Sequence, residues 1–346
     1  AQLANNELTY EKKHELNFGI DAGFLNNRIN FTFDIYSRRN YDLIGVINTQ
    51  GTGGEPRKYG NVAKMKSNGV EIALNTVNIK TKDFTWTTDL IYSHMHNEVT
   101  ELNTLNRMYD YISGSGFTMP GYPQRSLFSI PFMGLNNEGL PTFLDQDGNV
   151  SVTGINMQEY DPERLKFLKY EGPVDPTDVG SLGNVFRYKG VTLNLFITYS
   201  FGNVVRLDPV FSSSYSDLTA TPKEFKDRWV KPGDENFTNV PVIASKQQLN
   251  NIAYLSTAYQ AYNYSTERVA KGDFIRMKEI SLGYEFPKSI TQPLRLSNLS
   301  LKLMATNLFL IYADKKLNGQ DPEFFNAGGV ANPMPKQFTL TLKFGI

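Results

Sequence analysis

Alternation of apolar and polar residues with a period of two dominates this sequence. In the last nine residues, 338–346, every second side chain is large and apolar, and the residues between are polar or glycine. The same alternation occurs in the windows 16–24, 29–35, 70–74, 84–92, 191–201, 280–286 and 299–303. Because successive side chains of a strand point to opposite faces, each window predicts a strand with one apolar and one polar face. We therefore predict an all-β chain.

The connectors between these windows fall into two length classes. The short ones are 25–28, 80–83, 136–139 and 188–190, and 287–298 is of medium length. The long ones, which we expect to be loops, are 37–67, 97–125, 146–183, 202–273 and 309–337. If 127–135 and 140–145 form a hairpin, short and long connectors alternate strictly along about eleven strands.

This alternation of lengths separates two all-β architectures. A soluble β-sandwich buries its apolar faces and need not sort its loops by length. An antiparallel transmembrane β-barrel turns its apolar face to lipid and has short turns at one end and long extracellular loops at the other. Aromatic residues near predicted strand ends, such as Phe24, Tyr92 and Tyr199, are typical of a membrane interface. We therefore predict a transmembrane barrel over residues 1–346, with the β-sandwich as the alternative.

The odd number of strands predicts a larger barrel. Single-chain bacterial barrels normally have an even number of strands, and an unpaired strand edge is costly in lipid. About eleven strands would be half of the roughly 22 strands of a plugged barrel. We therefore expect the chain to form the C-terminal half of such a barrel.

Composition narrows the function classes further. Lys+Arg and Asp+Glu both number 35, so the formal net charge is zero and no basic surface for nucleic acid is expected. No apolar stretch reaches the length of about 18 residues that a transmembrane helix needs. Cysteine is absent, which excludes disulfides, thiolate metal sites and a cysteine nucleophile.

Candidate catalytic or metal-ligating groups are few. His94 and His96 share one face of a predicted strand, but no carboxylate follows two residues later, and we expect them to be polar interface residues. The acidic segment 145–149 lacks the glycine position and the distal glutamate of a calcium loop and predicts a turn. Segment 51–54 is not followed by the Lys-Ser/Thr pair of a phosphate loop. We predict neither an enzyme nor a bound metal or cofactor.

The long connector 202–273 is the main candidate for ligand contact. Loops of this length are usually functional or disordered, and its aromatic rings can stack on sugars or receive peptide side chains. The candidate substrate-binding residues are Tyr215, Trp229, Tyr259, Tyr262 and Tyr264. The alternative is that these rings pack the core of the loop itself or a partner surface. A capping box predicts a short helix at 222–230, and a second helix is predicted at 161–170.

Several segments, taken in order, resemble one family. They are 8–21, 61–71 (with Ala63 where glycine is usual), 186–190, 273–287, 306–309 and 321–323. Together they are similar to the SusC/RagA family of TonB-dependent outer-membrane transporters, and they cover nearly the whole chain.

This resemblance implies a nutrient importer in the outer membrane of a Gram-negative bacterium. Such a protein imports oligosaccharides or oligopeptides with energy transmitted through TonB, and a SusD-like surface lipoprotein covers its extracellular mouth. Its TonB box and plug would lie upstream of this chain, and its barrel would contact membrane lipid. Glycan and peptide cargo are both compatible with aromatic-rich loops. The alternative function is that of a secreted or surface β-sandwich that binds glycans without transport.

Overall fold

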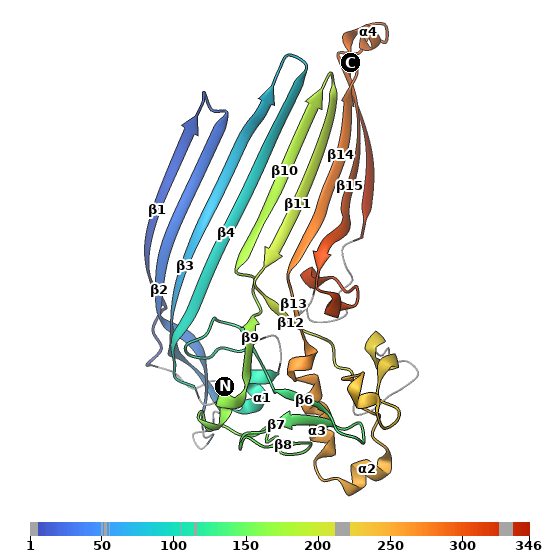
Figure 1. The fold of residues 1–346 in the computed structure, drawn as a ribbon. Helices are drawn as coiled ribbons and strands as arrows, with labels where there is room; N and C mark the ends of the chain where they lie inside the picture. The colour runs from blue at the N-terminus through green and yellow to red at the C-terminus, as the bar shows by residue number, and fades with distance from the viewer. Residues whose placement is uncertain are drawn as a thin grey trace.

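An antiparallel sheet of nine strands forms the main body of the chain (Figure 1). The computed structural model describes residues 6–49, 51, 54, 56–104, 106–113, 116–211, 222–324 and 335–346. In sheet order the strands are β1 (Lys12–Phe24), β2 (Ile29–Asn48), β3 (Arg57–Lys80), β4 (Phe84–Leu102), β10 (Asp178–Tyr188), β11 (Val191–Phe201), β14 (Phe274–Glu285), β15 (Asn298–Ala313) and β16 (Gln337–Gly345).

One face of this sheet is apolar across its whole width. The strand register aligns the apolar side chains in rows, such as Ile20, Phe33, Ile72 and Tyr92 in the first four strands and Leu193, Leu282, Leu303 and Leu340 in the last four. Many of these side chains are exposed, including Phe18 at 59% and Phe338 at 71%. We call this side the outward face and the opposite, more polar side the inner face. The predicted one-sided strands are therefore confirmed, and no second sheet of the described residues covers the outward face as a β-sandwich would require.

The connectors between strands of the nine-stranded sheet sort by length between its two ends, as predicted, whereas the predicted short connector 136–139 lies within the long segment 103–177. The turns at 25–28, 81–83 and 189–190 lie at one end, together with α4 (Lys288–Thr291) (Figure 1). The described parts of 103–177 and 202–273 lie at the other end.

The nine-stranded sheet is the wall of the molecule, and the predicted hairpin of 127–135 and 140–145 is not part of it. Its residues form β5 (Ser126–Ser129), which pairs with β9 (Lys169–Pro173), and β6 (Phe132–Leu135), which joins β7 (Pro141–Leu144) and β8 (Val150–Ser151) in a separate sheet. The prediction of about eleven wall strands was wrong for these two, because an apolar strand face looks the same in sequence whether it meets lipid or a protein core. The half-barrel of a larger assembly stays a prediction.

Strands β2 and β3 extend far into the segment 37–67, which was predicted to be a loop. β2 continues to Asn48 and β3 begins at Arg57, so most of 37–67 is a two-stranded ribbon instead of a loop. The strand pairing continues past two register shifts, one between Asn40 and Leu43 and one between Leu43 and Ile44.

Both predicted loop helices are present but short. The segment at 222–230 contains the 3₁₀ helix η2 (Lys223–Asp227), and the segment at 161–170 contains η1 (Arg164–Phe167) before β9 begins. The remaining elements of the long connectors are α1 (Met108–Ile112), β12 (Val204–Arg206), η3 (Asp234–Asn236), α2 (Lys246–Asn251), α3 (Leu255–Asn263), η4 (Thr266–Arg268), β13 (Val269–Lys271), η5 (Lys315–Leu317) and η6 (Pro322–Phe324).

The nine-stranded sheet is open. Within the described residues, β1 pairs only with β2 and β16 pairs only with β15. None of the helices in the described part of the chain combines the length and apolar character needed to cross a membrane.

Candidate functional site

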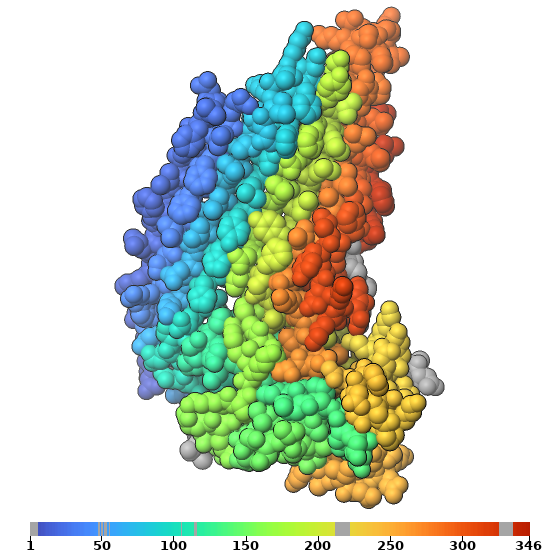
Figure 2. Space-filling model, viewed as in Figure 1, coloured from blue at the N-terminus to red at the C-terminus, as the bar shows by residue number. Residues whose placement is uncertain are grey.

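The long connectors fold together beyond one end of the sheet (Figures 1 and 2). We call the described parts of 103–177 and 202–273 the loop domain. Its core is built from segments far apart in sequence, with the buried side chains of Met108, Ile112, Ile130, Leu140, Phe143, Val210, Phe211, Leu255, Tyr259 and Tyr262. Since each segment contributes only a few apolar residues, the segments bury their apolar surface against one another.

Four of the five predicted substrate-binding residues lie in or beside this core. Tyr262 has 0% of its surface exposed, and Tyr259 and Trp229 are also buried. Tyr264 is half-buried beside them, and Tyr215 lies outside the described residues. The positions of the three buried rings match the alternative interpretation, that the aromatic cluster packs the loop's own core. Their contact with substrate stays a prediction, and it would require the core to open.

Edge-to-face ring contacts hold these tyrosines in place. The ring centroids of Phe211 and Tyr259 are 4.8 Å apart, and those of Phe132 and Tyr262 are 5.5 Å apart. Burial strongly raises the pKa of Tyr262, and burial also raises the pKa of Tyr264 to about 12. Both hydroxyls are therefore protonated at neutral pH and cannot act there as bases.

Trp229 is held in place by a hydrogen bond and by packing against a glycine. Its indole N–H donates a hydrogen bond to the carboxylate of Glu235 at 2.8 Å. The ring lies against Gly139, where a Cβ would clash with it. This hydrogen bond is the leading cause of the lowered pKa of Glu235, and the N–H group of Gly233 donates to the same oxygen.

Arg206 connects three segments of the loop domain. Its guanidinium donates to the carbonyl of Phe128 at 2.6 Å, to the hydroxyl of Ser129 at 3.1 Å, and to the carbonyls of Ser265 and Ile112 at 3.3 and 3.4 Å. Burial lowers the pKa of Arg206 to about 10, so the group stays charged at neutral pH. A buried charge with several hydrogen bonds fixes β12, β5 and the start of η4 relative to one another.

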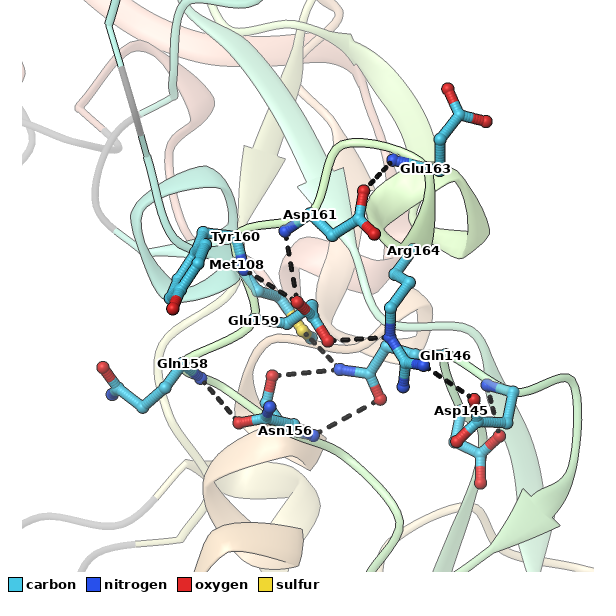
Figure 3. A network of polar contacts seen from close by, with 11 residues as sticks. Met108, Asp145, Gln146, Asn156, Gln158, Glu159, Tyr160, Asp161, Glu163 and Arg164 are labelled. Carbon is cyan, nitrogen blue, oxygen red and sulfur yellow. Dashed lines mark hydrogen bonds and ion pairs between the residues drawn. The ribbon is translucent and has the colours of Figure 1, made fainter.

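A polar network attaches segment 154–164 to its neighbours (Figure 3). The carboxylate of Glu159 accepts from the N–H group of Asp161 at 3.1 Å and from Arg164 at 2.8 Å. Arg164 also forms an ion pair with Asp147 at 3.1 Å, and the N–H group of Met108 donates to the Glu159 carbonyl at 2.6 Å. The segment is therefore held both to α1 and to the β7–β8 turn.

The surface of the loop domain presents other large side chains to solvent. Phe237 is 91% exposed, Tyr254 is 74% exposed and Tyr160 is 58% exposed. Exposed aromatic groups of this kind are common at binding surfaces. These three residues are not among the predicted substrate-binding residues, because alternation in sequence does not show which loop aromatics remain at the surface.

His94 and Asp145, from two of the other predicted polar sites, have structural partners. His94 Nδ1 lies 2.8 Å from a carboxylate oxygen of Asp178 on the neighbouring strand, a contact across strands that local spacing could not show. Asp145 accepts from the N–H groups of Asp147 and Asn149, which closes the predicted turn. The described residues contain no cluster of three or more His, Asp or Glu side chains that could hold a metal ion.

Comparison with known proteins identifies the family. The family model for the TonB-dependent receptor-like β-barrel matches residues 1–208, which is more than half of the 346 residues. This chain belongs to the TonB-dependent receptor β-barrel family. Proteins of this family are found in the outer membrane of Gram-negative bacteria.

Curated relatives and solved structures of this family extend the match to the whole chain. TonB-dependent receptor P39 of Formosa agariphila is 26% identical over 96% of this chain and 34% of its own length. TonB-dependent receptor SusC of Bacteroides thetaiotaomicron is 27% identical over 98% of this chain and 32% of its own length. The chain therefore spans about a third of the length of these relatives.

Two structures of RagAB share the fold. The RagAB peptide transporter gives a TM-score of 0.74 at 24% identity, covering 99% of this chain and 36% of that chain. The RagAB peptide importer in its closed-closed state gives 0.70 at 22% identity, again covering 99% of this chain and 36% of that chain. The SusC/RagA resemblance expected from the sequence motifs is confirmed.

Two of the motifs that carried this family resemblance meet in the structure. Arg276, in segment 273–287, is buried and forms an ion pair with Asp321, in segment 321–323. Arg276 Nε also lies 3.1 Å from a carboxylate oxygen of Glu323. The pairing holds the connector between β15 and β16 against β14 in this family member.

Proposed function

We propose that this chain forms part of the wall and the extracellular loops of a TonB-dependent importer in the outer membrane. The whole protein would carry oligosaccharides or oligopeptides inward and would work with a SusD-like surface lipoprotein. The observation that carries the proposal is an apolar outward face across nine strands, capped at one end by the loop domain, in a chain of this family.

Lipid is the natural environment for the outward face. In water, exposed apolar side chains in continuous rows would drive aggregation, whereas in a bilayer they match the hydrocarbon. On β1 the alternating apolar positions run from Leu16 to Phe24, a length of nine residues that suits a tilted membrane strand.

The open edges of the sheet support a larger barrel. Unpaired backbone groups of β1 and β16 would have no hydrogen-bond partners in hydrocarbon, so both edges require further strands. Because the chain spans about a third of its relatives, we assign those strands, the plug and the TonB box to the rest of a longer polypeptide.

The loop domain is the proposed contact region for cargo and lipoprotein. Its exposed aromatic side chains, Phe237, Tyr254 and Tyr160, offer surfaces for stacking on sugars or packing on peptides. Of the predicted substrate residues that the structure describes, half-buried Tyr264 is the most accessible, and it packs against the core that contains Tyr259 and Tyr262.

Uptake by a loop-shortened variant tests this proposal. The N–H group of Leu207 donates to the carbonyl of Arg268 at 2.9 Å, so residues 209–266 can be replaced by a short glycine-rich linker between neighbouring chain ends. We expect the full-length variant to insert in the outer membrane but to lose TonB-dependent uptake of labelled oligopeptides or oligosaccharides and to lose its lipoprotein partner.

A matched control shortens the opposite end. Replacing the α4 connector, 288–296, by a tight turn alters the sheet end away from the loop domain and should leave uptake intact. Normal uptake by the variant lacking 209–266 would refute the role of the loop domain. An unmodified full-length protein that stays soluble without detergent would refute the transporter function itself.

A further inference from the structure

The outward face has a hollow of about 380 Å³ close to its extracellular end. Four apolar side chains line it, those of Leu16, Phe18, Ile35 and Val70, and His94 and His96 border it. These residues belong to two adjacent rows of the sheet, in which Phe18 lies opposite Ile35 and Val70 lies opposite His94. A depression of this size can hold part of an alkyl chain.

A row of basic residues follows directly on the extracellular side of the hollow. The register places His14 opposite Arg39, and Arg39 opposite Lys66. All three lie on the outward face. Each is two positions along its strand from a residue that lines the hollow, and side chains two positions apart on a strand share a face. His14 and Arg39 are exposed, and the ring of His14 contacts that of Tyr41 edge-on at 5.5 Å.

Arg39 carries the net positive charge of this row. Lys66 pairs with Glu98 at 2.8 Å, and farther out Lys12 pairs with Asp42 at 2.7 Å. In the part of the chain that the structure describes, no carboxylate lies within ion-pair distance of Arg39. A planar, exposed guanidinium with free N–H donors is well suited to a phosphate group.

The position of the basic row along the strand matches the boundary between hydrocarbon and headgroups. If Leu16 to Phe24 spans the apolar layer, then Leu16 lies at its outer limit and His14 lies just beyond it. An amphiphile in the outer leaflet would therefore place its alkyl chain over Leu16, Phe18 and Ile35 and its headgroup at Arg39.

The geometry points to a binding site for an anionic lipid of the outer leaflet, with one acyl chain in the hollow and its phosphate on Arg39, flanked by His14 and Lys66. This inference rests on the proposed function, because it needs the outward face to contact lipid. Charge complementarity selects the headgroup: a zwitterionic lipid would place its own cation beside the same basic row.

Competition between two lipids of equal chain length tests the site. The full-length protein is reconstituted into nanodiscs with equal amounts of phosphatidylglycerol and phosphatidylcholine, and the lipids that remain bound after detergent extraction are counted by native mass spectrometry. We expect the unmodified protein to retain phosphatidylglycerol in excess, and Arg39→Gln to lower that excess about fivefold. Ser37→Phe, which places a ring into the hollow from an exposed outward position, should lower retention of the lipid without removing the charge.

Arg38→Gln is the matched control, because Arg38 is the neighbouring residue on the inner face, where it pairs with Glu15 at 3.1 Å. It should retain the lipid like the unmodified protein. Equal retention of both lipids by the unmodified protein, or an unchanged excess in Arg39→Gln, would overturn the inference. If millimolar inorganic phosphate displaced the lipid while Ser37→Phe had no effect, the acyl-chain part would be wrong. A protein that selects neither lipid but still resides in the nanodisc leaves the transporter proposal standing.

Discussion

Buried polar side chains set the local conformation of the loop domain, residue by residue. The side chain of Asn263 accepts from the N–H group of Val210 at 3.1 Å and donates to the carbonyl of Phe211 at 2.8 Å. One side chain therefore provides hydrogen-bond partners for backbone groups that lie outside any helix or strand. Arg268 donates to the carbonyl of Asp208 at 2.7 Å and pairs with Glu224 at 3.2 Å. Since an unpaired buried polar group costs free energy, these contacts favour one arrangement of the loop.

The hydrogen bond between Trp229 and Glu235 predicts a pH-dependent signal. The folded-state pKa of Glu235 is lowered from its ordinary 4.5, so the stabilisation by the carboxylate is complete above pH 4.5 and is lost as the pH falls through the lowered pKa. We expect the ¹⁵N–¹H resonance of the Trp229 indole, identified by its absence in Trp229→Phe, to be constant above pH 4.5 and to shift below it.

Glu235→Gln is the control for this titration. The amide oxygen can still accept from the indole but does not titrate, so the shift should disappear in this variant. A shift that persists in Glu235→Gln would show that another group is responsible.

Individual elements of the loop domain are too short to be stable alone, and contacts between elements stabilise them. α1 has five residues and β5 has four, well below the length at which an isolated helix or hairpin forms. Arg206 on β12 joins α1, β5 and the start of η4 through hydrogen bonds to buried backbone.

Arg206→Met should therefore loosen several elements at once. Removing the guanidinium leaves buried carbonyls without donors, and we expect the opening free energy of the loop domain to fall by about 2–4 kcal/mol. Hydrogen exchange at the amides of Ile130 and Thr266, which bridge β5 and η4, should accelerate accordingly. Arg206→Lys keeps the charge but loses the planar guanidinium with its several N–H donors, so it should give an intermediate effect. Unchanged exchange at both amides in Arg206→Met would argue against this role.

At the scale of the whole molecule, an introduced positive charge should destabilise the sheet far more on its outward face than on its inner face. Phe33 lies on the outward face opposite Ile20, at the middle of the apolar band, whereas neighbouring Thr32 faces Asp21 on the inner face and donates to it at 2.7 Å. In a bilayer, Phe33→Arg should lower the free energy of unfolding by about 2–4 kcal/mol. Thr32→Arg, whose cation meets the Asp21 carboxylate, should have a much smaller effect.

Urea unfolding of the full-length protein in lipid vesicles measures both variants. A similar loss in the two would mean that the outward face does not contact hydrocarbon. Such a result would contradict the membrane orientation proposed above, because hydrocarbon would penalise charge on the outward face much more than on the inner face.

The sequence by itself determined the wall of this protein. Alternation such as that of 338–346 decides which side chains share a face, since the period of a strand is a local property of the backbone. Eight of the nine wall strands contain one of these alternating windows, whereas β10 was indicated only by the short connector 188–190 that follows it. The motifs at 61–71 and 273–287 indicated the family.

Only the tertiary structure determines which side chains of the loop domain are buried and what they contact. Whether Phe143 meets lipid or protein depends on α1 and α3, which lie far away in the sequence, so the hairpin at 127–145 could not be separated from the wall. Tyr262 and Phe237 are both aromatic loop residues, yet one is buried and the other exposed, because burial depends on which segments pack around each ring. The partners Asp178 for His94 and Asp321 for Arg276 likewise arise from long-range contacts, which no local spacing encodes.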